Sequence, residues 1–254
     1  MLNLLNHWLE LKYKIFYYFC SFFITFCICF LYNDVLTYFV SIPLFKINPH
    51  FLNNSKGFIF TSLMEGFHSS LFISFHFAII FTLPLFFFLL YNFLKPGLFK
   101  REKSALNLFF VCESFGFILS CIFTFFILLP NFYTFFLSFE QTNDFNLFKL
   151  SLEAKIFDYI HITINLFWLS FLLFQIPLSL ALLLYCNVVK INFLLGKRRE
   201  ILLLSFIFGA LFSPPDVFSQ LVIAILLYSI FELISISFVL KNCYQNYINK
   251  KYNF

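Results

Sequence analysis

The sequence predicts an all-α membrane protein with six transmembrane helices. Of its 254 residues, 61% are hydrophobic and only 11% are charged. The mean hydropathy of +0.90 is well above that of soluble globular proteins. The apolar residues also fall into separate runs divided by polar segments. Because a bilayer offers no hydrogen-bond partners to the backbone, such runs indicate membrane-spanning helices.

Six apolar runs define the expected helices. They cover residues of about 15–32, 67–93, 105–129, 159–186, 201–212 and 217–240. Neither an internal repeat nor a low-complexity linker separates these runs, so we expect a single polytopic domain over residues 1–254. We also expect kinks at Pro84 and Pro177, which fall inside the second and fourth runs.

The distribution of Lys and Arg predicts the orientation. Of the 17 cations, all but Lys46, Lys56, Lys149 and Lys155 lie in the N-terminus, the second connection, the fourth connection or the C-terminus. Cationic residues favour the cytoplasmic side of a membrane. Both termini are therefore predicted on the cytoplasm-equivalent side. The long connection of residues 33–66, on the opposite face, could contain a short helix.

The last two helices are predicted to form a short hairpin within Ser213–Glu232. Pro214 and Pro215 cannot continue the fifth helix, and Asp216 is an N-cap residue type that can start the sixth. The twelve residues of the fifth run would span roughly 18 Å, whereas the hydrocarbon core is about 30 Å thick. Helices 5 and 6 are thus expected to be short.

Four stretches share one resemblance. They are HWLELK at 7–12, TSLMEGF at 61–67, FLKPGLFKRE at 93–102 and PPDVFSQ at 214–220. In this order they resemble the TatC family, the core of the twin-arginine protein translocase, over nearly the whole chain. Lys12 stands where the family usually has Arg, which keeps the charge but loses the planar donor pair.

The resemblance implies a receptor that binds twin-arginine signal peptides and helps to move folded proteins across an energised membrane, using the proton gradient. It implies TatA/TatB-like single-span partners and a homo-oligomer within the complex. No enzymatic activity, catalytic residue, metal, cofactor or nucleic acid is expected.

By the same resemblance, Glu10, Lys12 and Glu102 are the expected signal-peptide site. Glu10 and Glu102 are two of three acidic residues on the predicted cytoplasmic side, with Glu200. A guanidinium group offers two parallel donors that fit a carboxylate, so paired carboxylates suit paired arginines. The alternative is that both acids merely balance nearby lysines. For Glu65, stabilisation of a helix start is a sufficient explanation.

Polar residues inside the apolar runs are the expected partner contacts. They are Gln175, Asp216, Gln220 and Glu232. Many family members have Glu where this chain has Gln175. Glu113 has no counterpart in the family pattern and is expected to be hydrogen-bonded within the bundle.

Two other classes of function compete with a translocase. A small-solute or ion transporter of an organelle inner membrane could use Glu113, Gln175 and Glu232 as an intramembrane relay. A haem-handling subunit would need paired intramembrane histidines, and the scatter of the five histidines along the sequence disfavours it.

Composition also bears on the source and location. The chain has 46 Phe and two Met, which suggests an AT-rich genome and hence an organelle-encoded protein. We expect the mitochondrial inner membrane, with a plastid thylakoid or bacterial plasma membrane as the alternatives. The seven cysteines form no CxxC motif and are expected to be packing residues.

Overall fold

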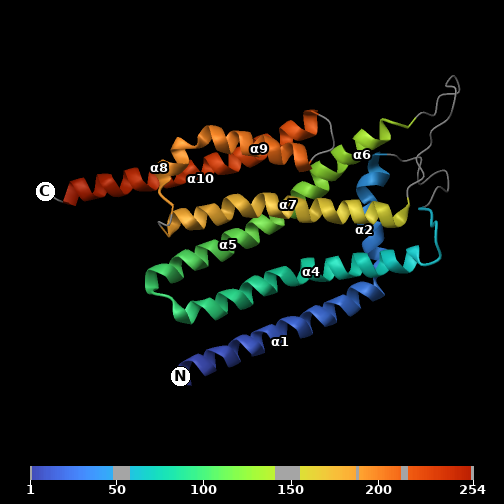
Figure 1. The fold of residues 1–254 in the computed structure, drawn as a ribbon, viewed down its shortest axis with the longest axis horizontal. Helices are drawn as coiled ribbons and strands as arrows, with labels where there is room; N and C mark the ends of the chain where they lie inside the picture. The colour runs from blue at the N-terminus through green and yellow to red at the C-terminus, as the bar shows by residue number, and fades with distance from the viewer. Residues whose placement is uncertain (1, 48–57, 141–154, 187–188, 213–216, 253–254) are drawn as a thin grey trace. The chain divides into compact units, whose positions relative to one another are not determined.

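The computed structural model describes residues 2–47, 58–140, 155–186, 189–212 and 217–252 (Figure 1). The described chain is helical apart from its connections and one isolated bridge between Ile59 and Lys155. Its elements are α1 (Leu2–Leu31), α2 (Asn33–Ile47), α4 (Glu65–Leu94), η1 (Lys95–Gly97), α5 (Lys100–Phe123), η2 (Thr124–Leu128), α6 (Leu129–Leu137), α7 (Ile156–Tyr185), α8 (Ile191–Gly196), α9 (Arg198–Phe212) and α10 (Val217–Tyr252). The predicted all-α class is confirmed.

Five described segments are long and apolar enough to cross a membrane. They are His7–Leu31, Glu65–Gly97, Lys103–Leu137, Ile156–Tyr185 and Ser219–Lys241. Helix α9 has 15 residues and covers about 22 Å, which is short, as expected. The chain divides into two compact units. Unit 1 contains residues 1–103 and 121–168, and unit 2 contains residues 104–120 and 169–254.

Unit 1 is built on the antiparallel pair α1 and α4. His7 contacts Phe93 at one end of the pair, and Phe22 contacts Phe75 further along. Helix α2, the short helix expected within residues 33–66, packs on α4 and α6. The hydroxyl of Tyr159 on α7 donates to the Val40 carbonyl of α2 at 2.9 Å, which ties α2 to the unit.

The predicted end of the third helix at residue 129 is wrong. The helix continues as α6 to Leu137, through Pro130. Proline cannot donate a backbone hydrogen bond and clashes with the carbonyl four residues earlier. The π-helical turn η2 accommodates the proline. In this turn the Leu129 N–H donates a hydrogen bond to the Thr124 carbonyl, five residues earlier, instead of four. Pro130 then occupies the first turn of α6, where an N–H is not needed.

In unit 2, α9 and α10 form an antiparallel hairpin. Its contact layer includes Ser205 and Gly209 of α9 and Ile223, Ala224 and Leu227 of α10, all buried. The expectation that the sixth helix is short is wrong, because α10 has 36 residues and continues to Tyr252. The polar residues after Leu240 include no Gly or Pro, so nothing in the sequence ends the helix there.

Gly209 allows this hairpin to close. A Cβ atom at this position would lie 2.8 Å from the Gln220 carbonyl oxygen and 3.3 Å from the Ala224 Cβ. We predict that Gly209→Val destabilises the protein by about 1–3 kcal/mol, because backbone on α10 must move. The melting midpoint in detergent should fall by roughly 5 °C. Gly196→Val is the matched control, since a Cβ there meets nothing within 4 Å. Equal midpoints for the two variants would contradict the prediction.

Candidate functional site

The first turns of α1 dock on the end of α4. The His7 ring stacks on the Phe93 ring, with centroids 4.4 Å apart and planes 14° apart. The Lys14 Nζ donates to the Asn92 carbonyl at 2.9 Å and lies 5.6 Å from the Phe93 centroid. One stacked ring pair and one cation therefore fix the start of α1 against α4.

The predicted signal-peptide residues of α1 lie within this docked segment. The side chains of Glu10 and Lys12 are both exposed. The Glu10 Oε2 lies 3.7 Å from the His7 Nδ1, and the Glu10 side chain is 56% exposed. This ion pair exists only while His7 is protonated. The position of the Glu10 backbone is thus held by contacts of its neighbours, while its carboxylate stays accessible.

Glu102 belongs to the same end of unit 1. The chain leaves α4 at Leu94, passes through η1 at Lys95–Gly97 and enters α5 at Lys100. The backbone of Glu102 is in the first turn of α5, and its side chain lies outside the described residues. The structure brings the start of α1 and the connection between α4 and α5 to one end of the unit.

In unit 2, Gln175 and Glu113 lie together. The Gln175 Nε2 is 3.5 Å from the Glu113 carbonyl oxygen, and the Glu113 side chain is only 4% exposed. The Gln175 Oε1 is buried and has no partner among the described residues. An unsatisfied buried acceptor costs about 1–3 kcal/mol.

Glu232 has a different environment from Gln175. Its Oε1 lies 3.1 Å from the Arg198 Nη2, and its Oε2 is 3.5 Å from the Ser235 hydroxyl. Glu232 therefore links α10 to the start of α9. Gln220, half-buried, lies near the other end of the α9–α10 hairpin, where its carbonyl approaches Gly209. Asp216 lies outside the described residues.

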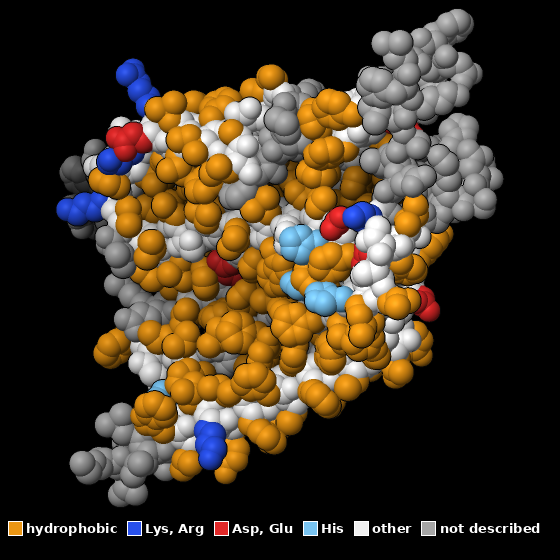
Figure 2. Space-filling view, turned by 45° about the vertical axis from the view of Figure 1, so that its right-hand side comes forward, with side chains coloured by type: hydrophobic (Ala, Val, Ile, Leu, Met, Phe, Trp, Pro, Cys, Tyr) orange, Lys and Arg blue, Asp and Glu red, His pale blue; other side chains and the backbone are white. Residues whose placement is uncertain are grey.

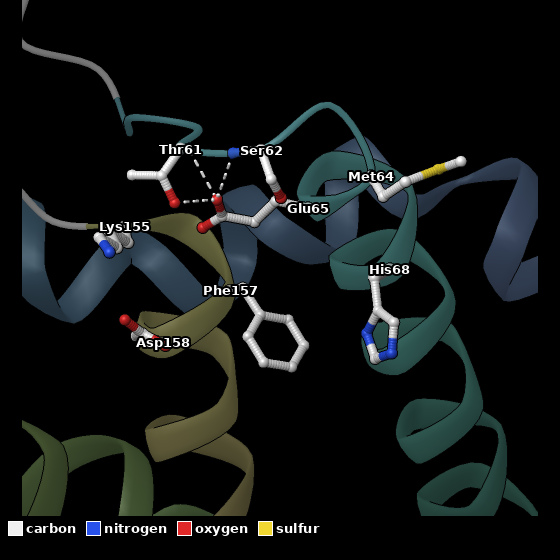
Figure 3. A pocket seen from close by; sticks show the side chains of 8 residues that line it. All are labelled: Thr61, Ser62, Met64, Glu65, His68, Lys155, Phe157 and Asp158. Carbon is white, nitrogen blue, oxygen red and sulfur yellow. Dashed lines mark hydrogen bonds between the residues drawn. The ribbon is translucent and has the colours of Figure 1, made fainter.

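A second polar site, which we did not predict from the sequence, lies at the opposite end of unit 1. It is a cavity of about 370 Å³ between the segments that start α4 and α7, and we call it the α4–α7 pocket (Figure 3). Its lining residues are Thr61, Ser62, Met64, Glu65, His68, Lys155, Phe157 and Asp158. The only available signal was that both charged segments directly precede apolar runs on the same predicted face.

The histidines are also less scattered than the sequence suggested. Figure 2 shows histidine side chains gathered on one face beside acidic and basic ones. His76 and His161 contact the Phe72 ring, at 4.2 and 5.4 Å between centroids, and His68 contacts Phe157 at 5.0 Å. His68 and His76 lie on α4, and His161 lies on α7. These two helices pack together although they are far apart in the sequence, so the sequence did not show that the three side chains meet. The described residues nevertheless contain no group of three or more potential ligands placed to hold a metal ion.

The family of this chain follows from its similarity to known proteins. The sequence model described as "Sec-independent protein translocase protein (TatC)" matches residues 6–225. The chain belongs to the TatC family. A tatC-like protein, ymf16, of Nephroselmis olivacea is 34% identical over 228 residues, which cover 90% of each chain. The Sec-independent protein translocase protein TatC of Rickettsia prowazekii is 31% identical, over 89% of this chain and 88% of that one.

The TatC fold is matched by solved structures as well. A crystal structure of the twin-arginine translocase receptor TatC in DDM aligns with a TM-score of 0.68 and 24% sequence identity. The alignment covers 91% of this chain and 98% of that one. The helical arrangement is thus that of TatC.

The range matched by the TatC family model covers most of the predicted residues. The matched range includes Glu10, Lys12, Glu102 and Gln175, but it ends before Glu232. Glu232 pairs with Arg198, whereas Gln175 contacts Glu113. Among the described side chains, these contacts do not connect Glu232 with Glu113 and Gln175. The three residues therefore do not form the relay that a transporter would need.

The docking of α1 on α4 can be tested at Phe93. We predict that Phe93→Ala speeds amide hydrogen exchange of residues 7–14 roughly fivefold, because the stacked pair and the cation–π contact contribute about 1 kcal/mol. Mass spectrometry of the exchanged protein measures this effect. Phe88→Ala, on an exposed position of the same helix, is the control. If both variants exchange alike, Phe93 does not hold α1.

Proposed function

We propose that this chain is the signal-peptide receptor and core subunit of a twin-arginine translocase. In this proposal, Glu10 and Glu102 bind the paired arginines of a signal peptide, and Lys12 contributes to the same surface. The observation that carries the proposal is the accessible Glu10 carboxylate on a helix start that is fixed by His7, Lys14 and Phe93. The names of the Rickettsia relative and of the solved receptor support it.

The chemistry favours arginine over lysine at such a surface. Each guanidinium group can donate two parallel hydrogen bonds to one carboxylate, whereas an ammonium group is a compact point charge. The charged partner of Glu10 in the structure is His7 at 3.7 Å, a long contact that an incoming guanidinium can displace. An exposed ion pair contributes at most about 1 kcal/mol, so two pairs give modest and reversible binding.

The membrane arrangement is part of the same proposal. We infer a single polytopic domain in which α9 is a sixth span, sunk to part depth or surrounded by thinned lipid. Both termini then lie on the cytoplasm-equivalent side, in agreement with the distribution of Lys and Arg. The membrane is the mitochondrial inner membrane, and transport of folded cargo draws on the proton gradient.

The proposed partners are TatA/TatB-like single-span subunits, within a complex that contains several copies of this chain. Their contact is assigned to Gln175, Asp216, Gln220 and Glu232. Support comes from Gln175, whose buried Oε1 has no partner among the described residues and can accept a hydrogen bond from a docking helix.

The receptor assignment predicts a loss of binding in the double variant Glu10→Gln with Glu102→Gln. Photo-crosslinking of a twin-arginine signal peptide in native membranes should fall about tenfold, since two exposed ion pairs are lost. A twin-lysine peptide should crosslink weakly to the unmodified protein. Glu200→Gln is the matched control, because Glu200 is the third acid on the predicted cytoplasmic side and pairs with Lys197 at 2.7 Å. Equal crosslinking by both peptides would remove the assignment.

The six-span arrangement predicts which cysteines react from each side of a sealed vesicle. In a cysteine-free background, Trp8→Cys and a retained Cys243 should react with a membrane-impermeant maleimide from one side. Leu63→Cys and Val217→Cys should react from the other. All four positions are exposed. Reaction of positions 8 and 243 from opposite sides would reduce the arrangement to five spans.

A further inference from the structure

The α4–α7 pocket is assembled by the segments that precede two spans. The Ile156 N–H donates to the Ile59 carbonyl at 3.4 Å, and Ile59 and Lys155 form a parallel bridge. This contact joins residues almost 100 positions apart in sequence. It sets Lys155, just before α7, and Asp158, in the first turn of α7, opposite the first turn of α4 (Figure 3).

The pocket contains charges of both signs. The Glu65 Oε2 accepts hydrogen bonds from the Thr61 N–H at 2.7 Å, the Thr61 hydroxyl at 2.8 Å and the Ser62 N–H at 3.3 Å. Its carboxylate is therefore fixed in one position. Lys155 and Asp158 lie across the cavity (Figure 3). Two carboxylates, of Glu65 and Asp158, face the one ammonium group of Lys155, so the acidic side chains of the pocket outnumber this cation.

A second cavity of about 210 Å³ adjoins the first and shares Lys155 and Asp158 with it. Its remaining lining is aromatic or aliphatic: Leu44, Phe132, Tyr133, Phe136, Tyr159 and Ile162. Tyr133 is only 6% exposed, and its ring stacks on that of Tyr159, with centroids 5.3 Å apart. Apart from Lys155 and Asp158, the two tyrosine hydroxyls are the polar groups of this lining.

We propose that the two cavities form one binding site for a phospholipid with a primary-amine headgroup. The ammonium group lies between Glu65 and Asp158, and Lys155, which lies beside both acids, holds the phosphate (Figure 3). One acyl chain enters the apolar cavity. The depth is suitable, because candidate spans begin at Glu65 and Ile156 and headgroups lie at span ends.

The charge balance selects this class of lipid. A primary ammonium group donates up to three hydrogen bonds to the two carboxylates, whereas a quaternary ammonium group donates none. An anionic headgroup without an amine places its charge beside Glu65 and Asp158 and is repelled. This site goes beyond the proposed function, since it lies at the opposite end of α4 from Phe93 and Glu10.

The test uses the purified full chain with an equimolar mixture of phosphatidylethanolamine, phosphatidylcholine and phosphatidylglycerol that have identical acyl chains. Native mass spectrometry measures which lipid stays bound. We expect phosphatidylethanolamine to be retained about tenfold over both others, as charge-assisted hydrogen bonds to an amine are lost in them. Equal retention of the three lipids by the unmodified protein would overturn the proposal without any variant.

Variants locate the site. In Glu65→Gln with Asp158→Asn, the preference for phosphatidylethanolamine should fall to near one, while the Gln amide oxygen still accepts from Thr61. Asp34→Asn, which changes an acid of unit 1 outside both cavities, should leave the preference unchanged. A preference that persists in the double variant would place the lipid elsewhere and sink the assignment.

Discussion

The absence of hydrogen-bond partners in hydrocarbon is the constraint on which the rest of this structure depends. It makes the described chain helical, and it also governs the small polar side chains. Ser74, Thr82 and Thr163 each donate a hydroxyl hydrogen bond to a carbonyl of their own helix, four residues earlier. The same constraint explains the π-helical turn before Pro130, which re-pairs a backbone that the proline would otherwise break. Because these polar groups are hydrogen-bonded within their own helix, the helices can pack on one another through aromatic and small side chains.

One departure from this rule lies in the region assigned to partner subunits. The buried Gln175 Oε1 has no hydrogen-bond partner among the described side chains. Such an atom costs free energy in an apolar environment unless another molecule supplies its hydrogen bond. Glu232 shows the contrast, because its pairing with Arg198 serves the hairpin itself.

The two ends of unit 1 use charge in different ways. At the end where α1 starts, a His–Phe stack and a Lys–carbonyl bond fix the helix, and the Glu10 carboxylate remains exposed. At the other end, one oxygen of the Glu65 carboxylate, Oε2, accepts hydrogen bonds from Thr61 and Ser62, and this acid lines a cavity. An exposed carboxylate suits transient binding of a peptide, whereas a fixed one inside a cavity suits a resident ligand.

The sequence by itself determined the helical class, the order of the apolar segments, the short α9 and the TatC family, because each depends on local composition or on motifs of a few residues. It did not determine where polar side chains meet. The Arg198–Glu232 pair, the gathering of His76 and His161 around Phe72, and the pocket between the starts of α4 and α7 join residues far apart in the chain. The continuation past Pro130 likewise needed the π-helical turn. Only the tertiary structure decided these features, since helix packing chooses which faces of two distant segments touch, and periodicity within one segment carries no information on its neighbour.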